Sequence, residues 1–178
     1  MEDGPCPEVR YMSYAPVPGG AMKILQVSVL AILLTFSLAL AQEVKPVKPS
    51  KEDKCPVCGM FVAKYPDFLA QVIFKDGSYA FFDGVKDLYK YYFDIKKYNP
   101  SKDVADIDMI YVADYYSLNP IDGRKAWYVV ESDVYGPMGK ELIPFQKEDE
   151  AKEFMMDHGG KMLMRFDEVT PSLIKGLD

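Results

Sequence analysis

Apolar and polar residues alternate in several short segments of the chain, and this pattern predicts half-buried β-strands. Residues 69–74 and 78–82 are two such segments, and Asp76-Gly77 between them is typical of a hairpin turn. Asp83 then precedes a predicted helix and is a suitable N-terminal cap. The apolar face of that helix is formed by residues at helical spacing, namely Val85, Leu88, Tyr89, Tyr92 and Phe93.

A second set of segments repeats this order. Residues 126–130 and 142–145 are predicted strands, and the intervening segment 134–140 contains the tight-turn sequence Gly136-Pro137-Met138-Gly139. A second helical face follows, made by Ala151, Phe154, Met155 and His158, with Gly159 as a suitable C-terminal residue. Further strands are expected at 109–112 and 161–166. The sequence therefore predicts an α+β fold of two small strand–strand–helix units with mostly antiparallel sheets in one compact domain.

An apolar segment near the N-terminus indicates an exported protein. Lys23 precedes an almost wholly apolar run from Ile24 to Leu40, and Ala39-Leu40-Ala41 has the small-x-small pattern of a signal-peptidase site. We expect residues 22–41 to be a signal peptide, with an uncleaved membrane anchor as the alternative. Both interpretations place the rest of the chain outside the cytoplasm. We expect residues 1–21 to be a non-native leader before a true start at Met22, or a disordered one.

The remaining chain has the length and composition of one globular domain with short flanking segments. Residues 42–54 contain Pro46, Pro49 and four lysines, which predicts an extended linker; residues 55–170 form the expected domain and 171–178 a C-terminal tail. The formal net charge of the whole chain is −6, without long charged runs. This charge argues against nucleic acid or an anionic membrane surface as a partner, so membrane contact is expected only through the signal or anchor segment.

The segment most suggestive of chemistry is Cys55-Pro56-Val57-Cys58-Gly59-Met60. It contains the only cysteines that follow the predicted signal, and Met60 adds a thioether. Soft sulfur ligands favour Cu(I) or zinc over cations that prefer oxygen. Met138 is a further candidate ligand, because it lies in a loop where helix or strand periodicity does not commit its side chain to the core.

Three other roles for the cysteine pair remain open from the residues alone. A closed zinc site normally has four ligands, and it would require His158, the only histidine, and a carboxylate in addition to the pair. A thiol oxidoreductase would place the pair at a helix start, which Gly59 would interrupt. A structural disulfide would close only a very short loop. His158 itself is also explained as a core or helix-end residue.

The chain resembles the NosL family of exported copper-binding proteins associated with nitrous oxide reductase maturation. The order and spacing of several segments carry this resemblance: Cys58-Gly59-Met60 with Tyr65-Pro66, residues 110–114, residues 127–130, residues 137–145 and residues 154–169. The resemblance implies Cu(I) ligation by Cys58, Met60 and Met138. It gives Cys55 a less secure role, because only some members have the Cys-x-x-Cys form.

The resemblance also implies a function, a fold and a partner. The expected fold is similar to a βα-repeat unit found in organomercurial lyases. The expected function is that of a periplasmic Cu(I) metallochaperone without enzyme activity, delivering copper to a client cuproenzyme or its membrane assembly machinery in denitrification. Family members are often lipoproteins with a cysteine at the cleavage site, whereas Gln42 follows Ala41 here, so no lipid anchor is expected.

Overall fold

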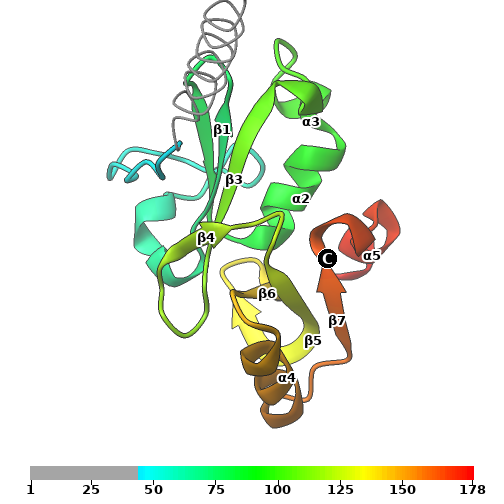
Figure 1. Cartoon of the computed structure of the whole chain (residues 1–178). Coiled ribbons are helices and arrows are strands. Elements are labelled where there is room, and N and C mark those ends of the chain that lie inside the picture. Colours follow the sequence, from blue (N-terminus) through cyan, green and yellow to red (C-terminus); the bar gives the residue numbers. More distant parts are fainter. Residues whose placement is uncertain (1–43) are drawn as a thin grey trace, which may run out of the picture. The chain divides into compact units, whose positions relative to one another are not determined.

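Two antiparallel sheets form the framework of residues 44–178, which are the residues described by this computed structural model (Figure 1). The first sheet has the strand order β2-β1-β3-β4. Its strands are β1 (Ala70–Phe74), β2 (Tyr79–Phe82), β3 (Ile107–Ala113) and β4 (Pro120–Asp122). β1 and β2 form a hairpin, and β3 returns antiparallel to β1 after helix α2 (Val85–Phe93).

The second sheet repeats this path. β5 (Trp127–Gly136) and β6 (Gly139–Phe145) form a hairpin, helix α4 (Glu148–Asp157) follows, and β7 (Met162–Arg165) returns antiparallel to β5. The strand order β6-β5-β7 matches the order β2-β1-β3 of the first sheet. The α+β class and the duplicated strand–strand–helix unit are thus confirmed, and each unit also includes the strand that follows its helix.

Within residues 44–178, helix α2 contributes to a core that is shared by both sheets (Figure 1). Tyr89 packs against Tyr128 of the second sheet and against Phe166, with ring centroids 5.9 Å and 5.0 Å away. On another side of the helix, Tyr91 is buried against Phe82, 5.1 Å between centroids. The predicted apolar face was therefore wrong in part: Phe93 is 37% exposed, because α2 is covered on more than one side.

The β5–β6 hairpin is longer than the sequence predicts. Most of the predicted loop 134–140 belongs to the two strands, which pair up to Gly136 and Gly139 and leave Pro137 and Met138 as the turn. The register shifts between Val130 and Tyr135, where Glu131 has a positive φ of 58°. Beyond Val130 the residues of β5 alternate between exposed and half-buried, whereas Tyr128, Val129 and Val130 are buried.

Segments on either side of the two repeats pack against them. Residues 44–53 contain no helix or strand, but the backbone of Val47 exchanges hydrogen bonds with the Gln71 side chain, and the Tyr111 hydroxyl donates to the carbonyl of Val44. At the other end of the described residues, after the second repeat, lies helix α5 (Pro171–Gly176). The short helix α3 (Ile95–Tyr98) belongs to the first repeat and follows α2.

No helix within residues 44–178 has the length and apolar character needed to cross a bilayer. The predicted signal peptide, 22–41, and the predicted leader, 1–21, lie outside the described residues.

Candidate metal centre

A short closed loop holds the two cysteines side by side. Lys54 and Phe61 pair as an isolated antiparallel bridge at its base. Inside it, the Cys55 amide donates to the Met60 carbonyl and the Gly59 amide to the Cys55 carbonyl, both at 2.9 Å. Gly59 has a φ of +78°, a conformation that glycine adopts without a steric penalty. The local sequence therefore folds into a knuckle, residues 54–61, with both thiols on one turn.

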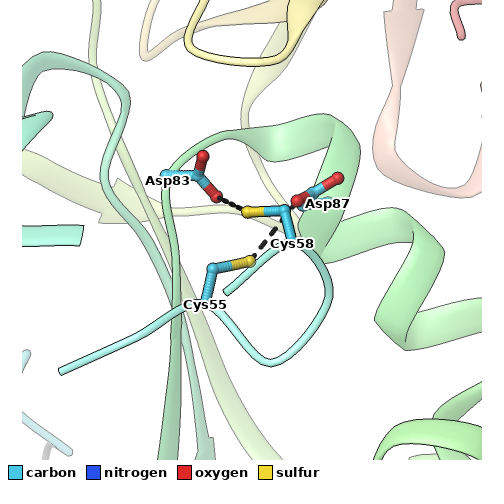
Figure 2. Close-up of side chains that lie close together, drawn as sticks. All are labelled: Cys55, Cys58, Asp83 and Asp87. Carbon is cyan, nitrogen blue, oxygen red and sulfur yellow. Dashed lines mark hydrogen bonds between the residues drawn. The ribbon is translucent and has the colours of Figure 1, made fainter. Parts of the chain in front are cut away.

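The junction between β2 and α2 supplies two carboxylates. Asp83 follows the last residue of β2, and Asp87 lies in the first turn of α2. Both carboxylates point toward the knuckle (Figure 2). Gly84 between them adopts an extended backbone and is the N-cap of the helix.

The two thiols and the two carboxylates converge in one cluster (Figure 2). The Cys55 Sγ donates to Asp87 Oδ2 at 3.4 Å, and the Cys58 Sγ donates to Asp83 Oδ1 at 3.1 Å. One ligand atom from each of the four residues lies within 4.8 Å of the others. Cys55, Asp83 and Asp87 are buried, whereas Cys58 is half-buried. The cluster thus reaches solvent on the Cys58 side.

The cluster contains more acceptors than donors. Asp83 Oδ2 and Asp87 Oδ1 are buried and have no hydrogen-bond partner among the described residues. Such atoms are rare in folded proteins, because an unpaired buried oxygen loses its hydration without compensation. Lys90 lies 3.7 Å from Asp87 Oδ1, close enough for charge attraction but beyond hydrogen-bond distance. Two thiols and two under-partnered carboxylates fit a cation.

The thiols are held in their protonated form when no cation is present. Burial raises the pKa of the Cys58 thiol to about 12, and the hydrogen bond to Asp83 acts in the same direction. Burial raises the pKa of Cys55 still further, with the nearby charge of Asp87 contributing. Both residues are free thiols. A bound cation reverses this balance, since it stabilises the thiolate that the carboxylates oppose.

The predicted methionine ligands lie on two separate segments. Met60 is half-buried in the knuckle, two residues after Cys58. Met138 is at the tip of the β5–β6 hairpin and is 42% exposed. Its carbonyl accepts a hydrogen bond from the Nζ of Lys86, the residue before Asp87, at 2.7 Å. The structure brings Cys55 and Cys58 together, and ligation by the sulfurs of Met60 and Met138 stays a prediction.

The sequence patterns did not indicate Asp87, and the predicted capping role of Asp83 is wrong, because Gly84 occupies the N-cap position of α2. The available signal was a pair of acidic residues four positions apart at a predicted strand–helix junction, which is a common pattern at helix starts. What distinguishes this pair is burial beside the knuckle, and that depends on contacts 25 and 32 residues apart in the chain.

His158 belongs to a different environment. It caps the C-terminus of α4, its Nδ1 lies 2.8 Å from Asp133 Oδ1, and its ring stacks on Phe154 with centroids 4.2 Å apart. Within residues 44–178, the one cluster of cysteine, histidine and acidic residues with converging ligand atoms does not contain His158. A zinc site at the cysteine pair would therefore use the two nearer carboxylates rather than His158, whose position at the end of α4 agrees with the interpretation as a helix-end residue.

Comparison with known proteins gives a consistent result over most of the chain. The NosL family matches residues 46–174. The copper-binding lipoprotein NosL of Stutzerimonas stutzeri is 29% identical over 163 residues, covering 83% of this chain and 82% of the relative. The protein of the same name from Achromobacter cycloclastes is 32% identical over 164 residues, covering 85% of this chain and 81% of the relative.

A solved structure agrees in fold. The crystal structure of the copper chaperone NosL from Shewanella denitrificans superposes with a TM-score of 0.63 at 26% sequence identity. The superposition covers 74% of this chain and 99% of that one. The duplicated architecture described above is therefore similar to that of a solved copper chaperone.

Proposed function

Because this chain belongs to the NosL family, we propose that it is an exported Cu(I)-binding metallochaperone. The observation that carries the proposal is the pair of reduced thiols, the buried Cys55 and the half-buried Cys58, which lie beside two carboxylates. The names of the relatives, copper-binding lipoprotein and copper chaperone, support copper as the cargo.

The donor set supports Cu(I) in particular. The two thiolates are soft ligands, and Met60 in the same loop and Met138 on the hairpin add thioethers, which also favour Cu(I). Cys58 is the more accessible of the pair, so an acceptor ligand would approach there. Transfer would proceed by stepwise exchange of ligands, with no covalent change to the protein and no enzyme activity.

The location and the acceptor follow from the same proposal. The predicted signal segment and the lipoprotein names of the relatives support an extracytoplasmic, periplasmic location. The proposed acceptor is a cuproenzyme or its membrane assembly machinery, with nitrous oxide reductase as the client that the family resemblance favours. On this view the protein serves denitrification through the maturation of that enzyme.

A zinc-stabilised domain is the second candidate, and the carboxylates favour it. Cysteine and aspartate are both ordinary zinc ligands, and a closed zinc site requires four ligands. The cluster supplies four such residues, namely Cys55, Cys58, Asp83 and Asp87. Copper and zinc make different demands on this set, because Cu(I) has little affinity for carboxylate oxygen. Loss of the two aspartates should therefore weaken zinc much more than copper.

A thiol oxidoreductase is disfavoured by the same geometry. Catalytic cysteines of that class have a lowered pKa, which supplies the attacking thiolate. Here burial and the adjacent carboxylates raise the pKa of both thiols. The knuckle also precedes a 3-10 turn, Val62–Lys64, rather than the N-terminus of an α-helix.

The test is competition for Cu(I) against a chromophoric chelator, with zinc measured in parallel. We expect Cys58→Ser to abolish tight Cu(I) binding, and Asp83→Asn with Asp87→Asn to reduce zinc binding while leaving most Cu(I) affinity. Met156→Ala is a matched control for methionine loss, because Met156 of α4 is exposed. Wild-type Cu(I) affinity in Cys58→Ser would overturn the copper proposal. Stoichiometric zinc in protein purified without copper, with unfolding on chelation, would favour the second candidate.

A further inference from the structure

A buried lysine ties the helix that carries Asp87 to the hairpin that carries Met138. Lys86 is only 1% exposed. Its Nζ donates to the carbonyl of Met138 at 2.7 Å and to the carbonyl of Leu177 at 3.2 Å, and lies 3.5 Å from Asp178 Oδ1. One ammonium group therefore joins the start of α2, the tip of the β5–β6 hairpin and the chain after α5.

A buried glutamate reinforces the same junction from strand β6. Glu141 Oε1 accepts hydrogen bonds from the backbone N–H of Lys86 at 2.5 Å and of Leu142 at 2.9 Å. Gly84 at the helix N-cap has no side chain to do this, so Glu141 satisfies one of the exposed N–H groups of the first turn. The second repeat thus caps the helix of the first repeat.

Two glycines make room for this carboxyl group. A Cβ at Gly84 would lie 2.1 Å from Glu141 Oε2, and a Cβ at Gly136 would lie 3.1 Å from the same atom. Gly84 is the N-cap of α2 and Gly136 is the last residue of β5, so Glu141 fills the space between the two elements. The backbone of the hairpin is therefore held against the helix start at two points, through Glu141 and through Lys86.

Stability alone does not account for this arrangement. A buried lysine must shed its hydration, and replacing buried charged groups with apolar ones of similar size is often neutral or stabilising. The hydrogen bonds of Lys86 end on backbone carbonyls of two distant segments, which fixes those segments relative to α2. One of the two carbonyls belongs to Met138 itself.

We propose that Lys86 is a positioning residue for the cargo site, holding the β5–β6 hairpin so that Met138 is presented to the cation bound at Cys58. The inference rests on the proposed Cu(I) function and adds to it a residue that bears no ligand atom for the metal. Glu141 supports Lys86 by fixing the first turn of α2.

A double-mutant cycle on Cu(I) affinity tests the proposal. The variants are Lys86→Met, Met138→Ala and the two combined, with Lys152→Met and Met156→Ala on α4 as matched controls. If Lys86 acts through Met138, the two single changes should each weaken binding, and Met138→Ala should have little further effect once Lys86 is replaced. We expect a coupling of about threefold or more in affinity, within the range for residues in contact. Effects that simply multiply would overturn the proposal.

A measurement on metal-free protein separates this proposal from the function on which it rests. Amide hydrogen exchange of residues 135–140 should speed up in Lys86→Met and remain unchanged in Lys152→Met. Unchanged exchange in Lys86→Met would overturn the positioning role even if copper binds. Faster exchange in a protein whose wild type binds no Cu(I) would refute the proposed function instead. If Lys86→Met does not fold, Lys86→Arg is the second variant, because it keeps a hydrogen-bond donor. Amide hydrogen exchange of residues 135–140 and the effect of Met138→Ala on Cu(I) affinity should both match the wild type in that variant.

Discussion

The two repeats have the same topology but differ at the junction between their second strand and their helix. In the first repeat β2 ends at Phe82 and α2 begins at Val85; in the second β6 ends at Phe145 and α4 begins at Glu148. Each junction is two residues long. The first contains Asp83 and Gly84 and is buried, whereas the second contains Gln146 and Lys147 and is exposed.

The difference extends into the first helical turn. Asp87 of α2 corresponds in position to Glu150 of α4, five residues after the terminal phenylalanine in each case. Asp87 is buried against the Cys55 thiol, while Glu150 forms a surface ion pair with Lys147. The apolar positions, by contrast, agree, since both Tyr91 and Phe154 are buried.

This comparison shows that the repeated framework does not by itself create the candidate site. The site arises where a segment outside the repeat, the 54–61 knuckle, covers one of two equivalent junctions. Burial then changes the chemistry of ordinary helix-start carboxylates, because water no longer satisfies them. A fold can therefore be duplicated while its chemistry remains in one copy.

The largest effect is expected from removing the thiol that makes the two junctions different. Cys58→Ser should lower Cu(I) affinity by more than about 100-fold, since even outer-shell partners of metal ligands are worth about 10- to 100-fold. His158→Ala, in the second repeat, should leave the affinity unchanged. Chelator competition measures both, and equal losses in the two variants would contradict the assignment of the site to the first repeat.

The pH dependence of Cu(I) affinity should reveal the buried environment of the thiols. Each thiol is protonated in the free protein and must lose its proton when it binds the ion, so the affinity rises with pH by about tenfold per unit for each thiol that binds. With the pKa of Cys58 raised to about 12, this rise should continue above pH 9. Titration at several pH values with a calibrated chelator checks the slope. A plateau near pH 9 would indicate thiols with an ordinary pKa.

The buried junction should also tolerate less volume than the exposed one. Gly84→Ala would place a Cβ 2.1 Å from the Glu141 carboxylate, and overpacking of this kind costs about 1–3 kcal/mol in the free energy of unfolding. Lys147→Ala, the equivalent position in the second repeat, should change stability by less than about 0.5 kcal/mol. Denaturant unfolding of metal-free protein measures both. Similar values for the two variants would show that the junctions are equally tolerant.

The smallest expected effect concerns the reactivity of the half-buried Cys58 thiol. Asp83 raises the pKa of Cys58 through its hydrogen bond, so Asp83→Asn should lower that pKa and increase the thiolate fraction at a given pH. Alkylation of the metal-free protein by iodoacetamide at pH 8 should become a few-fold faster. Glu150→Gln in the second repeat should have no effect. A slower reaction in Asp83→Asn would mean that the carboxylate controls access rather than charge.

Features encoded over short distances in the chain could be predicted from the sequence. The hairpin at Asp76-Gly77 and the helix starting near Gly84 each depend on a few neighbouring residues, and the structure contains both. The duplicated unit followed from repeated local patterns. Such features need no knowledge of the tertiary arrangement.

Features that depend on distant contacts could not be predicted. Nothing near Asp87 indicates that it would be buried against a cysteine 32 residues away, and nothing near Glu141 indicates that it would cap a helix 55 residues away. The burial of Tyr91 in place of Phe93 has the same origin, because α2 is covered by elements from both repeats. Polar groups that are satisfied across the fold leave no periodic signal in the sequence.

The unequal exposure of the two cysteines sets the order in which they would bind and release an ion during its transfer to a partner. An incoming partner can reach the half-buried Cys58, whereas Cys55 is buried in the same loop. The Cys58 sulfur would be the first to bind an arriving ion and the first to be replaced by a competing ligand. The Cys55 sulfur would be the last to dissociate from the ion. Binding and release of the ion would then take place on the same side of the cluster, with the two sulfurs acting in opposite order.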